Sequence, residues 1–272
     1  MHKFITFLRY LKDYLQYGQI LLVFVSIIYL LTGKAYPRTR LFRGKLGLFL
    51  HRKGSLDFQF GNYAYEWGVK QFFLKHYIHY QAFIDVGANM GTYTIMFAKK
   101  GMKTIAFEPS ISNFKALQIN IMLNDLERKV SSYNLGLDSK NHNASFVFDP
   151  VNTGASHLSS AQFHDPVTNE RGEITEVQLV MLDFLQNNLP LHVNDAVLMK
   201  IDVEGMEEHV ILGAKDFIQN RKELLIVMES VHSGEEKLKA VLSEIAEFEF
   251  LPVDSLNFAA KKIKNHNPKK SC

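Results

Sequence analysis

Short apolar runs alternate with amphipathic segments over residues 82–260, and this alternation determines the predicted fold. Apolar runs bounded by turn residues predict buried strands, and apolar positions at helical spacing predict helices. The predicted strands are Phe83–Val86, Thr104–Phe107, Val130–Leu135, an added strand from Ala144, Val197–Ile201 and Leu224–Met228. The predicted helices are Thr92–Lys100, Ser112–Asn124 with Ser112 as its cap, a segment around Glu207–Ala214, and Glu236–Phe248. Strands that alternate with helices in this way predict an α/β fold with a mostly parallel sheet.

The segments before and after this domain differ from it in composition and in hydrophobic pattern. Residues 1–45 form an apolar and basic extension, and residues 46–81 form a prelude in which LGLFLH and SLDFQF flank Arg52-Lys53-Gly54. Two alternating segments around such a turn predict a hairpin. An aromatic-rich helix is predicted over Tyr63–His79, with its rings in the core. Within the domain, Pro150–Gly172 is predicted to be a long polar loop, and after it residues 261–272 are predicted to be a solvated basic tail.

The N-terminal extension has the features of a segment that attaches to a membrane surface. Its longest apolar run, Ile20–Leu31, is too short to span a bilayer comfortably, and basic residues rather than a small-residue cleavage site follow it. Upstream, apolar residues recur at helical spacing with Lys3, Arg9 and Lys12 between them. This pattern favours a helix on the anionic cytoplasmic face of a membrane. The alternatives are packing on the chain's own domain or on a second subunit, and a true membrane span.

Composition and charge exclude several classes of protein. A hydrophobic fraction of 47% and a charged fraction of 22% are typical of a globular chain rather than a disordered one. A net charge of +3 over 272 residues gives no basis for a nucleic-acid partner, which needs concentrated Lys and Arg. The single cysteine, Cys272, excludes an internal disulfide and a cysteine-ligated metal, and it fits a reducing compartment such as the cytoplasm.

The segment FIDVGANMGTYT, Phe83–Thr94, carries the strongest chemical signal. An apolar strand ends in Asp85, then Gly87 and Gly91 bracket a turn, and a predicted helix follows. Glycine is required where a side chain would block a ligand or where the backbone takes a positive φ. Open α/β sheets bind ligands at this place, beyond the carboxyl ends of their strands. The segment therefore predicts a cofactor site.

The spacing and the charge of this segment distinguish two kinds of cofactor. A dinucleotide site has the spacing G-x-G-x-x-G, with a helix N-terminus at the pyrophosphate, whereas the glycines here are spaced G-x-x-x-G. Asp85 would repel a pyrophosphate, but it attracts a sulfonium cofactor that also bears an ammonium group. Glu108 ends the second predicted strand, where a carboxylate meets a ribose diol. The chemistry favours S-adenosyl-L-methionine.

Three ordered motifs resemble a known family. DVGANMGTYT, FEPSISNFKALQINIMLN and LMKIDVEGMEEHVILGA are similar to segments of the FkbM-type methyltransferases, and the likeness covers about Phe83–Glu229. The resemblance implies a Rossmann-like class I methyltransferase fold, with a seven-stranded sheet and helices on both faces. It also implies S-adenosylmethionine as methyl donor, and O-methylation of sugars or polyketide-type hydroxyls. The N-terminal extension lies outside the shared region.

The resemblance also implies which residues hold the cofactor. The turn after the first strand would hold the methionine half, the end of the second strand would bind the ribose, and the turn after the third strand would lie near the adenine. The residues at these three places are Asp85, Gly87, Asn89, Gly91, Glu108, Pro109, Gly136 and Asp138. Three asparagines at matching positions are either structural caps or ligands, and the sequence leaves both open: Asn113, Asn120 and Asn124.

Carboxylates follow the predicted strand Val197–Ile201, at the place where the methyl group should emerge. An alcohol is a poor nucleophile, so a positioned base that takes its proton typically contributes ~10²–10⁴-fold to the rate. Asp202 is the first candidate for this base, with Glu204 and Glu229 as further candidates. Glu204 has an alternative role as a cap of the helix that starts near Met206.

Three histidines and the expected absence of a metal complete the site prediction. His232 and His157 could reach the acceptor, whereas His209 is expected to be structural. Catechol-type methyltransferases hold a metal with an Asp-Asn pair after the fifth strand, where this chain has Glu229-Ser230. We therefore expect no metal.

The predicted function is O-methylation of a hydroxyl on a glycan or another small-molecule acceptor, which membrane attachment would allow to be lipid-linked. One alternative is a membrane-associated protein that binds S-adenosylmethionine without transferring its methyl group. Four intact carboxylates argue against it: Asp85, Glu108, Asp202 and Glu204. The other alternative is a nucleotide-dependent oxidoreductase, which the glycine spacing disfavours. The sequence does not name the acceptor, because the fold does not fix the substrate.

Overall fold

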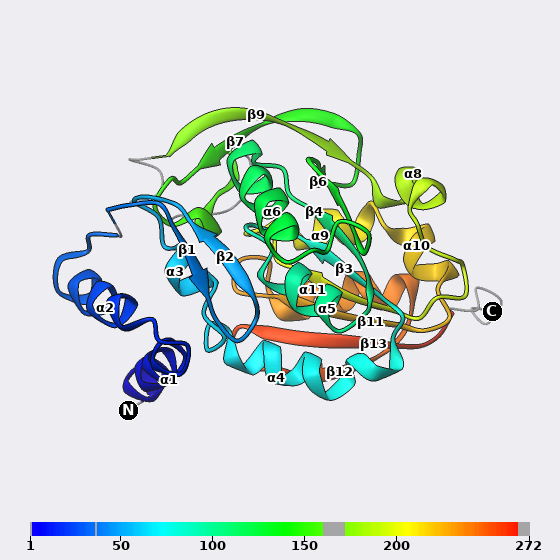
Figure 1. Ribbon diagram of the computed structural model, residues 1–272. Coiled ribbons are helices and arrows are strands. Elements are labelled where there is room, and N and C mark those ends of the chain that lie inside the picture. Colours follow the sequence, from blue (N-terminus) through cyan, green and yellow to red (C-terminus); the bar gives the residue numbers. More distant parts are fainter. Residues whose placement is uncertain (1, 36, 160–171, 266–272) are drawn as a thin grey trace, which may run out of the picture.

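The computed structural model describes residues 2–35, 37–159 and 172–265 of the chain (Figure 1). At its centre lies a seven-stranded sheet with the order β12-β13-β11-β10-β3-β4-β5. Its parallel strands are β3 (Ala82–Val86), β4 (Lys103–Phe107), β5 (Val130–Tyr133), β10 (Val197–Ile201) and β11 (Leu224–Glu229). A hairpin of β12 (Ala246–Pro252) and β13 (Asn257–Asn265) joins β11 in the antiparallel direction. The predicted α/β fold with a seven-stranded, mostly parallel sheet is confirmed.

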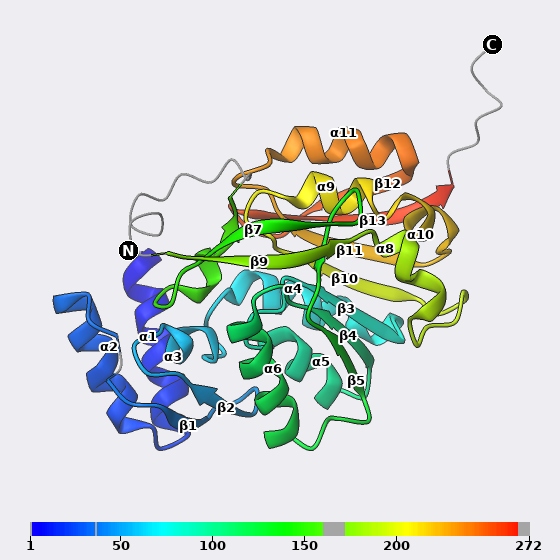
Figure 2. The same cartoon turned by 90° about the horizontal axis from the view of Figure 1, so that it is seen from above.

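Helices cover both faces of this sheet (Figure 2). One face carries α4 (Trp67–His76), α5 (Thr92–Lys99) and α6 (Ile111–Leu123), and the other carries α9 (Glu207–Leu212), α10 (Lys215–Asn220) and α11 (Glu235–Ile245). Since parallel strands are covered on both faces, they read as continuous apolar runs. Alternate residues of β3 face the two layers: Phe83 contacts the rings of Phe73 and Phe97, whereas Ile84 belongs to the apolar cluster that contains Phe217.

A second, four-stranded sheet has the order β6-β9-β7-β8. Its strands are β6 (Gly136–Leu137), β7 (His142–Phe148), β8 (His157–Leu158) and β9 (Glu173–Val180). The strand predicted from Ala144 is β7, so it belongs to this sheet and not to the central one. The predicted loop Pro150–Gly172 contains β8 and a short 3₁₀ turn, η2 (Thr153–Ala155), while residues 160–171 lie outside the described residues.

The N-terminal part of the chain forms helices and a hairpin beside the central sheet. Its elements are α1 (His2–Gln16), α2 (Ile20–Thr32), β1 (Arg40–Arg43), β2 (Leu48–His51) and α3 (Asp57–Phe60). The hairpin predicted between LGLFLH and SLDFQF is wrong, because β2 pairs with β1 and the SLDFQF segment contains α3. The physical reason lies in Asp57, whose carboxylate accepts hydrogen bonds from the backbone N–H and the guanidinium of Arg52. These bonds fold the chain into a turn that leads into a helix.

Three predicted boundaries also need correction. Ser110, not Ser112, caps α6, because its hydroxyl accepts the backbone N–H of Asn113. The predicted helix Glu236–Phe248 ends at Ile245, and the residues after it form β12. The predicted tail contains the end of β13, in which the buried Lys262 amine donates to the backbone carbonyls of Ile218 in α10 and of Arg221 after it, so it is not solvated there.

Several other elements match the sequence prediction or complete the fold. The predicted helix Tyr63–His79 is α4 with a 3₁₀ turn after it, η1 (Tyr77–His79), and it begins four residues later than predicted. Two short elements between β9 and β10 complete the fold, α8 (Leu182–Leu185) and η3 (Gln186–Asn188).

The N-terminal helices pack on the rest of the chain. The hydroxyl of Tyr14, which is fully buried, donates to the carbonyl of Phe58 at 2.6 Å. The carboxylate of Asp13 accepts the backbone N–H of Tyr63 at 3.0 Å. Buried residues of α1, α2, β1 and β2 share one apolar cluster with one face of the central sheet. Within the described residues, no helix is long and apolar enough to cross a membrane.

Two asparagines of α6 fasten this helix to β2. The side chain of Asn120 accepts the backbone N–H of Leu50 at 2.7 Å and donates to the carbonyl of Met90 at 2.8 Å. Asn124 bonds both the N–H and the carbonyl of Leu48. Both asparagines bond backbone groups of other elements, so their roles here are structural.

We expect Asn120→Ala to lower the free energy of unfolding by about 2–3 kcal/mol, because it leaves two buried backbone groups without partners. The matched control is Gln118→Ala, on the exposed side of the same helix, which should cost less than about 0.5 kcal/mol. Urea unfolding of both variants measures the difference. Equal losses in the two variants would show that the bonds of Asn120 do not stabilise the fold.

Candidate active site

A cavity opens at the carboxyl ends of β3, β4 and β10, where parallel sheets bind ligands. The strand ends contribute Asp85, Glu108 and Asp202 to its lining. The segment between α3 and α4 forms another wall with Tyr65 and Glu66, and the second sheet closes the cavity with apolar side chains. The elements that surround the cavity come from both sides of the predicted domain boundary at residue 82.

The turn after β3 lies against the end of β10. Gly87 has a φ of +82°, and a Cβ on it would lie 1.9 Å from the carbonyl oxygen of Asp202. No other residue fits there, because its side chain would occupy the space of a backbone atom. Gly91 has a φ of +90°, and a Cβ on it would come within 2.5 Å of Leu117. It does not line the cavity, and the glycine lets α5 begin close to α6.

Non-glycine residues with positive φ concentrate around this cavity. Of the four in the described part of the chain, Glu66, Asn89 and Glu204 line the cavity, with φ values of +46°, +50° and +50°, and only Asp125 lies elsewhere. Such conformations cost free energy and persist only where the surrounding structure imposes them. The backbone strain of the described chain is therefore concentrated where side chains must face a ligand.

Asp85 is buried at the end of β3, where one carboxylate oxygen accepts both the backbone N–H and the hydroxyl of Thr94, at 3.0 and 2.6 Å. Burial raises the pKa of Asp85 to about 6, although Lys200 and Thr94 act in the opposite direction. The other carboxylate oxygen takes no part in these two bonds, so the carboxylate can still accept a donor from a ligand.

Glu108 holds the end of β4 to the turn after β3. Its carboxylate accepts the backbone N–H groups of Asn89 and Ser110 at 2.8 and 2.9 Å, one on each oxygen. Burial raises the pKa of Glu108 to about 7. A carboxylate has about four acceptor positions, so acceptor capacity remains for a ligand beside these two bonds and the side chain of Asn113. This arrangement suits the pair of hydroxyls of a ribose, the role predicted for Glu108.

Of the two residues predicted near an adenine, Gly136 lines the cavity and Asp138 does not. Pro109 and Gly136 lie together, since a Cβ on Gly136 would come 3.3 Å from Pro109 and 2.4 Å from Leu179. Asp138 does not line the cavity, and its carboxylate bonds Ser139 and the imidazole of His209 at 3.0 Å instead. His209 bonds Asp138 and does not line the cavity, and the contact predicted between Asp138 and a cofactor has no support in this geometry.

Lys200 is buried at the end of β10 among carboxylates. Its amine lies 2.5 Å from the carboxylate of Asp202 and 4.0 Å from that of Glu66. Burial alone would lower the pKa of Lys200, but Asp202, Glu66 and Asp85 together raise it above the ordinary value. Lys200 is thus a cation at neutral pH, and Asp202 is its closest partner.

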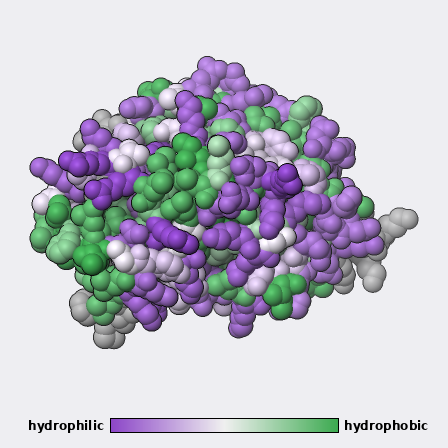
Figure 3. All heavy atoms as spheres, in the orientation of Figure 1, coloured by the Kyte–Doolittle hydropathy of each residue, from purple (hydrophilic) through white to green (hydrophobic). Residues whose placement is uncertain are grey.

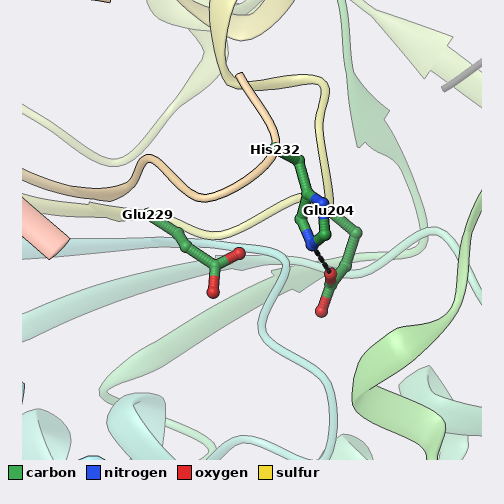
Figure 4. Close-up of side chains that lie close together, drawn as sticks. All are labelled: Glu204, Glu229 and His232. Carbon is green, nitrogen blue, oxygen red and sulfur yellow. Dashed lines mark ion pairs between the residues drawn. The ribbon is translucent and has the colours of Figure 1, made fainter. Parts of the chain in front are cut away.

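Glu204, Glu229 and His232 form a cluster of side chains whose ligand atoms lie close together (Figure 4). Glu204 lines the cavity, and its carboxylate lies 3.4 Å from Nε2 of His232. Burial raises the pKa of Glu204 to about 7, against the hydrogen bond from His232. Burial also raises the pKa of Glu229 to about 9, with the charges of Asp202 and Glu204 adding to the effect. Glu229 does not line the cavity, and its Oε2 has no hydrogen-bond partner among the described residues.

Carboxylates and an imidazole at this spacing could also hold a metal ion, since the three ligand atoms lie within 4.8 Å of one another. The expectation of no metal stays a prediction.

His157 is buried in β8 with its Nδ1 3.0 Å from the carbonyl of Ala155, and it does not line the cavity. The predicted contact of His157 with an acceptor has no support in this geometry.

The sequence did not reveal the cavity-lining residues that come from segments far from the three motifs. Glu66 and Tyr65 precede a helix with no motif around them, and Thr153 lies in the predicted loop. Asn113 donates to the carbonyl of Thr153 at 3.3 Å and accepts from Arg52 at 2.8 Å, which links that loop to β2. No local pattern could have revealed these contacts. Lys200 was visible in the motif KIDVEG, where a lysine ends an otherwise apolar strand.

The charge of the cavity wall is strongly one-sided. Among the described residues that line it, five are carboxylates and one is a lysine: Glu66, Asp85, Glu108, Asp202, Glu204 and Lys200. This wall would repel a pyrophosphate and attract a cationic ligand. The donors and acceptors thus fit S-adenosylmethionine, with Glu108 for the ribose and the remaining carboxylates near its positive groups.

Comparison with solved structures finds many of similar fold. A SAM-dependent methyltransferase from Agrobacterium tumefaciens is 10% identical, with a TM-score of 0.47 over 85% of this chain and 72% of the other. One from Aquifex aeolicus is 12% identical, with a TM-score of 0.41 over 71% and 87%. The ribosomal protein L11 methylase from Lactobacillus delbrueckii subsp. bulgaricus is 11% identical, with a TM-score of 0.41 over 76% and 81%.

These distant likenesses carry no functional argument, and no curated protein sequence is significantly similar to the chain. The family comparison is decisive. The model of the methyltransferase FkbM domain matches residues 85–254, which is more than half of the chain and includes the ends of β3, β4, β10 and β11. The chain belongs to the FkbM methyltransferase family, as its motifs predicted, and its cofactor is S-adenosylmethionine.

Proposed function

We propose that this methyltransferase transfers its methyl group to a hydroxyl of a sugar or glycan. The observation that carries the proposal is the composition of the cavity wall, with its five carboxylates and one lysine. Hydroxyl groups donate hydrogen bonds to carboxylates, so a polyhydroxylated acceptor suits this wall. Phe60 and Tyr65, whose rings meet edge to face at 5.1 Å, add apolar surface beside Glu66. A sugar ring offers both an apolar face and a rim of hydroxyls.

The position of the acceptor oxygen determines which group takes its proton. S-Adenosylmethionine supplies an electrophilic methyl on a cationic sulfur. The acceptor oxygen forms the new bond to the methyl carbon, the carbon–sulfur bond breaks with its electron pair going to sulfur, and the acceptor proton must leave. Glu204 lines the cavity and has a pKa of about 7, which suits a base at neutral pH. His232 holds the Glu204 carboxylate in place.

Asp202 has a different role in this proposal. The sequence made it the first candidate for the base, but its carboxylate lies 2.5 Å from the Lys200 amine. A carboxylate that is paired with a buried cation is held by that partner, because its loss would leave the cation buried and unpaired. Asp202 therefore contributes charge near the cofactor and holds Lys200, while Glu204 receives the proton.

The proposal includes the setting in which the enzyme works. A glycan carried on a membrane lipid, at the cytoplasmic face, is the acceptor that the basic and apolar N-terminal extension favours. The single cysteine, Cys272, agrees with a reducing compartment.

Calorimetry and NMR together distinguish a hydroxyl methyltransferase from a non-catalytic binding protein and from an oxidoreductase. We expect calorimetry to detect binding of S-adenosylhomocysteine and none of NAD, because the wall repels a pyrophosphate. We also expect ¹³C-methyl-labelled S-adenosylmethionine to give O-methyl signals by NMR with a panel of sugars and lipid-linked glycans. Binding of S-adenosylhomocysteine with methylation of amines only would contradict hydroxyl transfer, and binding without any turnover would favour the non-catalytic alternative. Binding of NAD would favour an oxidoreductase.

The affinity for S-adenosylhomocysteine should fall as the pH is lowered from 8 to 6. Glu108 has a pKa of about 7 in the free protein, so it is mostly ionised at pH 8 and mostly protonated at pH 6. Only the ionised form accepts both ribose hydroxyls, so Kd should rise up to about tenfold over this range. Calorimetry at both pH values measures the change.

The matched variants for this prediction are Glu108→Gln and Glu127→Gln. Glu108→Gln should bind at least about tenfold more weakly at pH 8, which is ~1.4 kcal/mol, and should lose most of the pH dependence. Glu127 is exposed beyond α6, so its variant should behave as wild type. A Glu108→Gln protein with normal affinity would show that Glu108 does not bind the ribose.

The two candidate bases can be distinguished by their variants. Once the panel yields an acceptor, Glu204→Gln should lower kcat at least about 100-fold with the affinity for S-adenosylhomocysteine unchanged, because it removes a base. Asp202→Asn should weaken S-adenosylhomocysteine binding, because it removes negative charge near the cofactor. The reverse pattern, with cofactor affinity lost in Glu204→Gln and only kcat lost in Asp202→Asn, would restore Asp202 as the base.

A further inference from the structure

The outward face of α2 is apolar, and the described part of the chain does not cover it. Leu22, Val25 and Ser26 are buried against the protein, and Tyr29 packs edge to face on Phe58 at 5.9 Å. The opposite side of α2 faces solvent. Its exposed large side chains are nevertheless all apolar. These side chains, with exposed fractions of 39–79%, are Ile20, Leu21, Phe24, Ile27, Ile28, Leu30 and Leu31.

This face is a concentrated patch and not scattered exposure. The described chain has twenty exposed large hydrophobic residues, and seven of them lie within these twelve positions of α2. Ile20, Phe24, Ile28 and Leu31 follow one another at helical spacing, so they form a stripe along the helix. Figure 3 shows the patch at the left edge of the molecule, where α2 lies in Figure 1. Contiguous apolar surface of this kind marks an interaction site.

The charge around the patch is basic. Residues 1–56 contain ten Lys and Arg and one acidic residue, Asp13, whereas the rest of the chain is acidic on balance. Asp13 is buried and bonded to the backbone of Tyr63, so it offers little charge to a partner. The basic residues that follow α2 and are exposed are Lys34, Arg38, Arg40, Arg43 and Lys45.

We propose that the outward face of α2 inserts into the surface of an anionic lipid bilayer, with the basic segment 34–45 on the headgroups. The helix has 13 residues and is about 20 Å long, shorter than the ~30 Å hydrocarbon core, and its inner face packs on the protein. It therefore lies in the plane of the membrane. A second copy of the chain fits this face less well, because symmetric pairing would bring two basic rims together.

The attachment would bring the cavity close to the membrane. Phe58, on which α2 packs, is followed by Phe60, Tyr65 and Glu66, which line the cavity. The backbone of Tyr63 in the same segment is held by α1. The thickness of α2 thus separates the bilayer from the segment that forms one cavity wall. The inference does not depend on the acceptor being a glycan.

The test uses the full-length protein and sedimentation with two kinds of vesicle, one of phosphatidylcholine alone and one that also contains phosphatidylglycerol. We expect at least tenfold stronger binding to the phosphatidylglycerol vesicles, weakened by salt because exposed charges are screened. Phe24→Glu with Ile28→Glu should lower this binding at least tenfold. Phe184→Glu, at an equally exposed apolar residue of α8, is the matched control and should bind as wild type.

A charge-reversal pair tests the basic segment separately. Lys34→Glu with Arg38→Glu should remove the preference for phosphatidylglycerol, whereas Lys215→Glu on α10 should keep it. Binding of S-adenosylhomocysteine verifies that each variant is folded.

Three results would overturn the proposal. The first is a wild type that binds neither vesicle, and the second is a Phe24→Glu, Ile28→Glu variant that binds both as wild type does. The third is a wild-type dimer, seen by light scattering, that this variant converts to a monomer without any change in sedimentation. That result would assign the face to a second copy of the chain.

Discussion

The burial of Lys200 among carboxylates is the interaction on which the site depends. The lysine ends β10, and its partners come from β3, from β10 itself and from the segment before α4. A buried charge is tolerated only when it is paired, so these three segments must meet at one place. The one lysine offsets only part of the charge of the five carboxylates that line the cavity. The remaining negative charge makes the cavity a place for a cationic ligand.

The backbone around Lys200 fixes the shape of this cavity. Gly87 lies so close to the carbonyl of Asp202 that no side chain fits between the two strands. Glu66, Asn89 and Glu204 are held at positive φ, which places two carboxylates and one backbone N–H around the cavity. The same geometry divides the carboxylates into two kinds. Asp202 is engaged by a cation, whereas Glu204 is buried next to an imidazole and is suited to exchange a proton.

Much of this arrangement could be predicted from the sequence, because the information was local. The central parallel strands are apolar runs, and the turn residues Gly87 and Glu108 follow two of them directly. The sequence could not predict the pairing of β1 with β2, because the alternation in SLDFQF resembles a strand. The hydrogen bond from Arg52 to Asp57, which turns this segment into a helix, forms only when the chain folds. Glu66 was missed because its partner, Lys200, lies far away in the sequence and comes near only on folding. The role of Asp202 was missed because the sequence does not show that Lys200, two residues before it, is buried and must be paired.

The cofactor's orientation in the cavity is the central claim that links these observations. A crystal structure of the protein with S-adenosylhomocysteine tests it most directly. The account predicts that both ribose hydroxyls lie within hydrogen-bond distance of the Glu108 carboxylate, and that the sulfur faces the side of the cavity formed by Asp202 and Glu204. A cofactor whose ribose lies away from Glu108, or whose sulfur faces away from Glu204, would contradict the account.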